Sequence, residues 1–450
     1  MNALTRDLIK LVDMTEEMMK EKEQKEGADY REKLHLMPPV GWLNDPNGLC
    51  QLNGIYHAFF QYSPFNAEGG VKMWGHYTSK DMIDWEYQGV KLYPDQPFDC
   101  HGVYSGSAFI EDDKMYVYYT GNVKLEDGDF DYINTGRESN TVLVVSEDGK
   151  TFGPKKELMR NVDYPSDLTC HVRDPKIWKE GDTYYMIQGA RTKEDVGQAL
   201  IFESKDKINW NFRSRVESEE PFGYMWECPD YFEVDNRQVV IFSPMQLFKD
   251  GKADDAQTVC MQVKFDKETC AMELPEEYQF LDYGTDLYAP QSTLDESGRR
   301  ILTAWLRMPE PVDGKWQGMM CIPRVVEVQK DHIYFRVHPN VQAAYTKEIS
   351  TQSEADESGY RLRFSLEDGD KVNVGGYVIS REGNKICTDR SALFEKFPNH
   401  RVKFETPEMK GFEIEVYVNP NQISVFVNDG EAVITNAVYD LEEKIEADVA

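Results

Sequence analysis

The chain of 450 residues has a shortage of positive charge and no long hydrophobic run. Its 50 Lys and Arg are outnumbered by 80 Asp and Glu, which gives a net charge of −30 at pH 7. That balance excludes a general nucleic-acid-binding surface, which needs clustered cations, and it disfavours an anionic membrane. Apolar stretches never reach the ~18 residues that a membrane-spanning helix needs. We therefore expect neither a nucleic acid nor a membrane as a partner.

Metal-binding and secretion signals are also missing from the sequence. The 8 cysteines form no Cys-x-x-Cys pair, no His–Cys cluster has zinc spacing, and no nucleotide-binding motif is present. The N-terminal segment is charged throughout and lacks the apolar core, about 7–15 residues long, of a signal peptide. We expect no metal, no cofactor, and a cytoplasmic protein with reduced thiols.

Residues that favour β-strands are abundant. The chain holds 25 Tyr and 22 Phe, and hydrophobic residues make up 40% of it. From residue 32 onward, short runs of Tyr, Val, Ile, Phe and Trp alternate with clusters of Gly, Asp and Asn, which is typical of an all-β protein. Residues 2–27 differ, because apolar side chains recur there at helical spacing up to Gly27. We predict an all-β fold preceded by a short helical segment, residues 1–31.

A repeated segment defines the expected architecture. Five segments share a polar start, an apolar strand, a turn and a second apolar strand; they begin at Asn44, Tyr104, Arg173, Glu227 and Tyr288. A unit of this kind exposes both faces of its sheet, and packing several copies around an axis buries those faces. The repeats predict a five-bladed β-propeller over residues 32–338 as the catalytic domain.

The C-terminal part has a different pattern. Residues 339–358 include the polar stretch STQSEADES, which predicts a linker. Short alternating segments follow over residues 359–450 and predict a β-sandwich. Within it, QISVFVND and EAVIT are expected to form a hairpin through the turn at Asn428, Asp429 and Gly430. The oligomeric state is left open.

Three carboxylates occupy matching places in the repeats. Asp45, Asp174 and Glu227 lie at the starts of repeats, and in a propeller the innermost strands start near one end of the axis. Like charges brought together repel each other, so such a cluster does not serve stability. A pair of carboxylates is the minimal equipment for glycoside hydrolysis. A metal site is the alternative, although calcium-loop spacing is absent.

Four motifs in this order carry a resemblance to a known family. HLMPPVGWLNDPNG, YSGSA, RDPK and WECPD together resemble the β-fructofuranosidases of glycoside hydrolase family 32, over roughly residues 30–435. The resemblance implies a five-bladed propeller followed by a β-sandwich, in agreement with the repeats. It implies hydrolysis of a β-fructofuranosyl bond through a fructosyl-enzyme intermediate.

The motifs also imply roles for individual residues. Asp45 matches the family's nucleophile, Glu227 its general acid/base, and Asp174 the carboxylate that bonds fructose hydroxyls. Arg173 is expected to keep Asp174 ionised. The remaining expected sugar contacts either flank the nucleophile or form an aromatic and polar rim: Trp42, Asn44, Gln61, Trp74, Tyr104, Ser105 and Trp305.

The stretch from Gly69 to Trp74 bears on the choice of sugar. It resembles the sucrose-6-phosphate hydrolase branch at Gly70, Lys72 and Trp74, while two His residues frequent in that branch are replaced. We expect a small-molecule sugar as substrate, sucrose 6-phosphate or sucrose, with Lys72 as a contact to the phosphate. A hydrolase of short fructans, a fructosyltransferase and a non-catalytic sugar-binding propeller are the alternatives.

Overall fold

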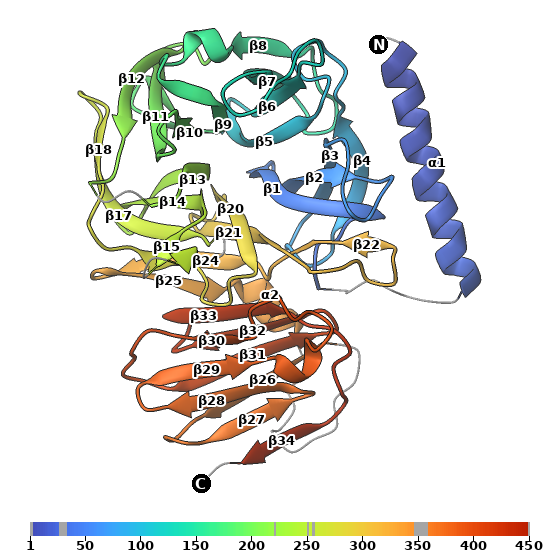
Figure 1. Ribbon diagram of the computed structural model, residues 1–450, viewed down its shortest axis with the longest axis vertical. Helices are drawn as coiled ribbons and strands as arrows, with labels where there is room; N and C mark the ends of the chain where they lie inside the picture. Colours follow the sequence, from blue (N-terminus) through green and yellow to red (C-terminus); the bar gives the residue numbers. More distant parts are fainter. Residues whose placement is uncertain are drawn as a thin grey trace.

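The computed structural model describes residues 3–26, 34–219, 222–249, 252–253, 257–345 and 359–448 (Figure 1). Strands dominate the described chain, which confirms the predicted fold class in its coarse form. Its helices are α1 (Ala3–Glu26), α2 (Pro339–Ala344) and two short 3-10 turns, η1 (Asn161–Asp163) and η2 (Ser391–Leu393).

Five sheets of at least four strands make up the part between residues 41 and 337. The first contains β1 (Gly41–Leu52), β2 (Ile55–Ser63), β3 (Met73–Ser79), β4 (Glu86–Leu92) and β22 (Trp316–Gln317). The second contains β5 (Val103–Glu111), β6 (Lys114–Lys124), β7 (Arg137–Ser146) and β8 (Lys156–Met159). The third contains β9 (Leu168–Glu180), β10 (Thr183–Thr192), β11 (Gly197–Ser204) and β12 (Asn211–Val216).

The last two of the five sheets follow the same order. One contains β13 (Met225–Val234), β14 (Arg237–Met245), β17 (Val259–Asp266), β18 (Ala271–Glu273) and β19 (Gln279–Phe280). The other contains β20 (Leu287–Leu294), β21 (Arg300–Leu306), β23 (Met319–Met320), β24 (Arg324–Gln329) and β25 (His332–Val337). A separate two-stranded ribbon pairs β15 (Phe248–Lys249) with β16 (Lys252–Ala253).

Each repeat recognised in the sequence supplies the first hairpin of one sheet. These hairpins are β1–β2, β5–β6, β9–β10, β13–β14 and β20–β21. Their first strands contact one another in order, and the ring closes because β20 also contacts β1 (Figure 1). The polar starts of the repeats are thereby brought together at the centre of the ring.

The C-terminal part consists of two packed sheets. One contains β26 (Tyr360–Ser365), β31 (Glu413–Asn419), β32 (Gln422–Val427) and β33 (Ala432–Ala437). The other contains β27 (Lys371–Val374), β28 (Tyr377–Glu382), β29 (Lys385–Asp389), β30 (Lys403–Glu405) and β34 (Ile445–Asp448). Apolar side chains from both sheets form one core cluster. The predicted hairpin between β32 and β33 is confirmed, and Asn428, Asp429 and Gly430 adopt positive φ in its turn.

A hydrogen bond from a buried ion pair of the ring, and a second ion pair, join this part to the ring. Arg324 Nη2 donates to Asp282 Oδ2 at 2.6 Å and to the hydroxyl of Thr435 at 2.9 Å. Arg390 pairs with Asp286 at the same interface. The two parts also share a hydrophobic core cluster, so they pack directly against each other.

Helix α1 lies along the outer side of the first sheet (Figure 1). Val12 is buried, and Glu16 accepts hydrogen bonds from the hydroxyls of Tyr62 and Tyr87. The stop predicted at Gly27 lies outside the described residues. Of the predicted linker, residues 339–344 form α2, and residues 346–358 lie outside the described part. None of the described helices is long and apolar enough to cross a membrane.

Candidate active site

A β-bulge re-aims the first strand of every sheet in the ring. Register shifts fall at Leu43/Pro46, Val103/Gly106, Glu227/Asp230 and Tyr288/Gln291, and β9 has one opposite Ile187/Gly189. A bulge places one extra residue in a strand and turns side chains away from the regular pleat. Proline is tolerated there because the ladder hydrogen bond is already lost, which explains why four of the five repeats carry a Pro at this point. The bulges turn motif side chains toward the ring centre.

Asp45 lies in the bulge of β1, surrounded by hydrogen-bond donors. The hydroxyl of Ser105 donates to Oδ2, Asn44 donates to Oδ1 at 3.1 Å, and Gln61 lies 3.5 Å from Oδ2. Burial raises the pKa of Asp45, while the hydrogen bonds from Ser105 and Asn44 oppose that rise. The donors therefore orient the carboxylate and support its ionised form, which is what a nucleophile needs.

Asp174 adopts a left-handed backbone conformation, with φ 65°. Its own N–H donates to the hydroxyl of Thr120 at 2.9 Å, and the N–H of Cys228 donates to its Oδ2 at 2.9 Å. Burial raises the pKa of Asp174 to about 7, against the opposing charge of Arg173. The thiol of Cys228 lies 3.7 Å from Asp174 Oδ2 and 3.8 Å from Asp45 Oδ2, so the two carboxylates converge on one point.

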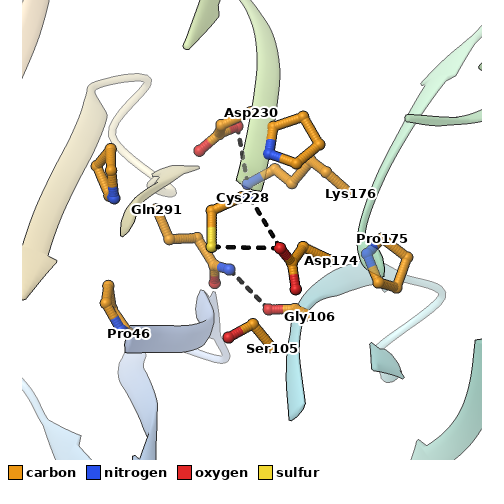
Figure 2. A pocket seen from close by; sticks show the side chains of 11 residues that line it. Pro46, Ser105, Gly106, Asp174, Pro175, Lys176, Cys228, Asp230 and Gln291 are labelled. Carbon is orange, nitrogen blue, oxygen red and sulfur yellow. Dashed lines mark hydrogen bonds and ion pairs between the residues drawn. The ribbon is translucent and has the colours of Figure 1, made fainter. Parts of the chain in front are cut away.

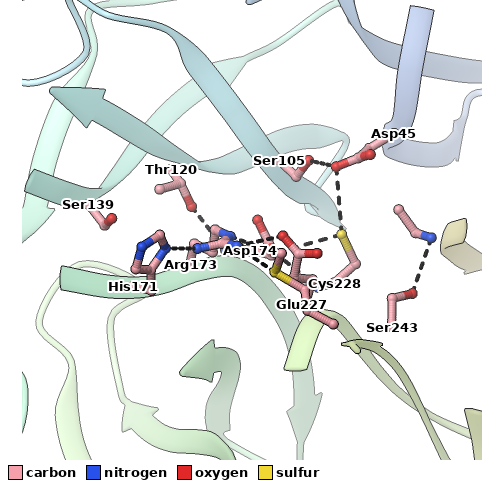
Figure 3. Close-up of polar contacts among 12 residues, drawn as sticks. Asp45, Ser105, Thr120, Ser139, His171, Arg173, Asp174, Glu227, Cys228 and Ser243 are labelled. Carbon is pink, nitrogen blue, oxygen red and sulfur yellow. Dashed lines mark hydrogen bonds and ion pairs between the residues drawn. The ribbon is translucent and has the colours of Figure 1, made fainter. Parts of the chain in front are cut away.

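Glu227 is held through both of its oxygens. Arg173 Nη2 donates to Oε1 at 2.5 Å, and the hydroxyl of Tyr288 lies 2.6 Å from Oε2. The closest approach of Arg173 to Asp174 is longer, 3.8 Å. The sequence predicted Asp174 as the partner of Arg173, but the guanidinium is shared and bonds more closely to Glu227 (Figure 3).

The hydroxyl of Tyr288 suits Glu227 in both protonation states. Its oxygen also lies 2.8 Å from the backbone carbonyl of Ser243, which can only accept a hydrogen bond. When Tyr288 donates to Ser243, its lone pair can accept a proton held on Glu227. When Tyr288 turns its proton to Glu227, it stabilises the carboxylate. An acid/base that first gives and later takes a proton needs such a partner.

A pocket at the ring centre is lined by residues of the first strands, among them Ser105, Asp174 and Cys228 (Figure 2). Lys176 and Asp230 pair across it at 3.1 Å, with side chains that are 10% and 2% exposed. Asp230 also accepts from the N–H of Ser292, so its charge is satisfied inside the ring. Gln291 bonds to the backbones of Leu49 and Gly106 and thereby ties three first strands together. This layer fixes the positions of the strands that carry the site.

Aromatic and cationic side chains form one wall of the site. Trp42 and Trp305 contact edge to face with ring centroids 5.7 Å apart, and both are partly exposed. Lys72 Nζ lies 4.9 Å from the centre of the Trp42 ring, and it is close enough to Asp45 for each charge to shift the other's pKa. Trp42 Nε1 donates to Asn44 at 2.7 Å, which links this wall to the nucleophile.

Trp74 does not lie where the sequence analysis placed it. Its side chain is 0% exposed and packs in an apolar cluster with Phe59 and Tyr119, so the expected rim position is wrong. The physical reason is that Trp74 lies on β3, which β2 separates from the innermost strand β1, and it donates its indole N–H to the backbone of Tyr104. Tyr104, at the start of β5, is itself partly exposed.

Sequence reasoning assigned no role to two residues of the site. Tyr288 occupies the start of the fifth repeat, the same position that holds carboxylates in other repeats, so the register pointed to it. Cys228 joins the site through its backbone, which has φ 47° and donates its N–H to Asp174. Within the described ranges, no group of three or more His, Cys, Asp or Glu side chains is arranged to hold a metal ion.

A convergent set of carboxylates on the first strands of a ring of sheets, with one carboxylate held by Arg and Tyr, defines the class as a glycoside hydrolase. The model of the glycosyl hydrolases family 32 N-terminal domain matches residues 35–339. The chain belongs to this family.

Relatives that match nearly the whole chain support the assignment to this family. The sucrose-6-phosphate hydrolase of Bacillus subtilis is 32% identical over 93% of this chain and 91% of its own length. The raffinose invertase of Escherichia coli is 33% identical over 90% of this chain and 88% of its own length.

Two solved structures are also similar. The sucrose-6-phosphate hydrolase of Lactobacillus gasseri has a TM-score of 0.83 at 24% identity, covering 97% of this chain and 94% of its own, which establishes likeness of fold. A mutant β-fructofuranosidase of Bombyx mori, solved in complex with sucrose, has a TM-score of 0.80 at 26% identity, covering 98% and 96%.

Proposed function

We propose that this protein hydrolyses the β-fructofuranosyl bond of sucrose 6-phosphate, and less efficiently of sucrose, with retention of configuration. The observation that carries the proposal is the pairing of Asp45, oriented by Ser105 and Asn44, with Glu227, whose Oε2 faces the hydroxyl of Tyr288. One carboxylate is arranged to act as an ion and the other can hold or release a proton. The choice of sucrose 6-phosphate as the substrate rests on the relatives that are named sucrose-6-phosphate hydrolase.

The reaction has two steps. Asp45 attacks the anomeric carbon of the fructosyl unit while Glu227 gives its proton to the leaving glycosidic oxygen, so one C–O bond forms and one breaks. Glu227, now a carboxylate, then takes a proton from water as the water attacks the fructosyl-enzyme and frees Asp45. Asp174 accepts hydrogen bonds from fructose hydroxyls, which favours its ionised form and stabilises the positive charge of the transition state.

The surrounding groups divide into supports and sugar contacts. Asn44, Gln61, Ser105 and Arg173 are buried and hold the carboxylates in place. Four partly exposed side chains are the proposed contacts to the sugar rings: Trp42, Lys72, Tyr104 and Trp305. Lys72 lies beside Asp45, which favours a contact with the fructosyl unit over its earlier assignment to the phosphate.

The finer architecture belongs to this proposal. We interpret the five sheets as the five blades of a propeller, residues 32–338, with an N-terminal helical segment, residues 1–31, a linker, residues 339–358, and a β-sandwich, residues 359–450. The cytoplasmic location predicted from the sequence remains a prediction.

Steady-state kinetics on sucrose 6-phosphate, sucrose and 1-kestose, measured side by side, test the function. The proposal requires the highest kcat/KM on sucrose 6-phosphate and release of β-fructose as the first product. A preference for 1-kestose would favour the fructan hydrolase, and binding of sugar without turnover would favour the non-catalytic propeller. Product analysis at high sucrose separates hydrolysis from fructosyl transfer.

A further inference from the structure

Arg137, the first residue of β7, carries a cation with no anion beside it. Its side chain is half-buried, its Nε is shielded from solvent, and the guanidinium has no hydrogen bond or ion pair to any described residue. Burial of an unpaired charge costs free energy unless a partner is supplied. Such a group stands out in a chain whose 80 acidic residues outnumber its 50 basic ones.

The backbone around Arg137 is fixed and turns its side chain toward the active site. Asn161 accepts from the N–H of Ser139 at 2.8 Å and donates to the carbonyl of Arg137 at 3.0 Å. The hydroxyl of Ser139 donates to the carbonyl of Cys170 on β9 at 2.8 Å. Side chains alternate along a strand, so Arg137 shares the face of Ser139 and points toward the start of β9.

His171, next to Cys170 on β9, lies among three guanidinium groups. Burial, together with the charges of Arg173, Arg137 and Arg191, lowers its pKa to about 3. Its Nδ1 is 2.5 Å from Nη1 of Arg173, and because a guanidinium only donates, Nδ1 is the acceptor of a neutral ring. A neutral His171 leaves the positive charge of its neighbours in place.

Two of the three guanidinium groups already have carboxylate partners. Arg173 pairs with Glu227 at 2.5 Å, and Arg191 pairs with Asp195 at 2.7 Å. Arg137 is the third. Asp131, an acidic residue of the preceding loop, is engaged within that loop, where its Oδ1 accepts from the backbone N–H groups of residues 133, 134 and 135. Among the described residues, Arg137 is therefore the member of this cluster whose guanidinium has no carboxylate partner.

We propose that Arg137 receives the phosphate of a phosphorylated leaving group and is a specificity-determining residue of the enzyme. The inference rests on the proposed function. Glu227 delivers its proton to the leaving oxygen, and Figure 3 places Arg173 and His171 on the side of Glu227 away from Asp45. A leaving group that departs from Glu227 in this direction brings its phosphate to the unpaired guanidinium. A planar guanidinium can bind two phosphate oxygens at once.

The test compares Arg137→Gln and Arg137→Lys with the wild type on sucrose 6-phosphate and on sucrose. Arg160→Gln is the matched control, because Arg160 is exposed and pairs with Glu157 outside the site. We expect Arg137→Gln to lower kcat/KM for sucrose 6-phosphate by about 30-fold, mainly through KM, and that for sucrose by less than about threefold. Arg137→Lys should fall between, because it keeps the charge and loses the two-point contact.

Equal losses on both sugars, or no loss on either, would overturn the assignment while leaving the hydrolase function standing. If Lys72→Met selectively lowered kcat/KM for sucrose 6-phosphate and Arg137→Gln did not, the phosphate contact would be assigned to Lys72 instead. Calorimetric titration with glucose 6-phosphate, with glucose as the neutral control, tests the pocket independently of turnover. Wild-type binding of glucose 6-phosphate that Arg137→Gln weakens about tenfold or more supports the pocket even if neither sugar is hydrolysed, and unchanged or absent binding refutes it.

Discussion

The hydroxyl oxygen of Tyr288 lies 2.6 Å from Oε2 of Glu227, and the same oxygen lies 2.8 Å from the carbonyl of Ser243. A hydroxyl has one proton to donate and lone pairs to accept with, so its orientation can follow the proton on Glu227. The carbonyl is a fixed acceptor that makes this switch possible. The relationship gives the acid/base a partner in both halves of the reaction.

Removing this hydroxyl should weaken proton transfer. In Tyr288→Phe we expect kcat on sucrose to fall about tenfold or more, since Glu227 loses the group that positions its proton. An aryl β-fructofuranoside with a good leaving group needs little protonation and should be affected far less. Equal losses on both substrates would mean that Tyr288 acts only through packing.

Glu227→Ala removes the acid/base itself. Poor leaving groups should slow most, the alkaline limb of the kcat/KM profile should vanish, and added azide should partly restore turnover of activated substrates by intercepting the intermediate. Glu227→Gln is the isosteric control for packing. An alkaline limb that persists unchanged in both variants would identify another group as the acid.

Lys72 should act on the nucleophile. Burial raises the pKa of Asp45, and the charge of Lys72 is one of the influences that lower it. Lys72→Met should therefore move the acid limb of kcat/KM to higher pH, because Asp45 must be ionised to attack. The shift should appear with sucrose as well as with sucrose 6-phosphate. The exposed Lys150 provides the control as Lys150→Met; an effect of Lys72→Met confined to the phosphorylated sugar would contradict this role.

The ionised carboxylate of Asp174 should lower the free energy of unfolding at neutral pH. Burial raises its pKa to about 7, so between about pH 4 and pH 7 the folded state holds a proton that the unfolded state has released, and stability falls as the pH rises. Asp174→Asn should therefore raise the free energy of unfolding at pH 7.5 by about 1–3 kcal/mol, and the gain should fade toward pH 4.

Thermal melts across this pH range measure the effect of Asp174→Asn. Asp206→Asn is the control of opposite sign, because backbone N–H groups hold the pKa of Asp206 below its usual range. Its carboxylate stabilises the fold above the unfolded-state pKa, and that stability is lost as the pH falls, so the variant should be less stable at neutral pH. A lower Tm for Asp174→Asn at pH 7.5 would show that hydrogen bonds outweigh burial.

Most of what the sequence could predict came from the repeats. The position of Asp45, Asp174 and Glu227 at repeat starts was enough to expect their convergence, because first strands in a ring meet at its centre. The sequence could not show that Trp42 lines the site and Trp74 does not, since both are tryptophans in segments that resemble the family. Their difference depends on strand order: Trp42 is on the innermost strand β1, whereas Trp74 is on β3.

Contacts between distant segments were beyond the reach of the sequence. The preference of Arg173 for Glu227 over its neighbour Asp174 depends on how β9 and β13 approach each other. The unpaired state of Arg137 likewise depends on which carboxylates the loop over residues 125–136 turns inward. Neither choice leaves a pattern in the order of residues.

The most direct test of the account is to trap the covalent intermediate. Glu227→Gln, incubated briefly with an activated β-fructofuranoside and quenched in acid, should form the fructosyl-enzyme and be slow to hydrolyse it. Peptide mass spectrometry is expected to find one fructosyl unit on the peptide that contains Asp45, and none when Asp45→Asn is introduced as well. A label on another carboxylate, or release of fructose of inverted configuration without any label, would contradict the assignment of Asp45 as the nucleophile.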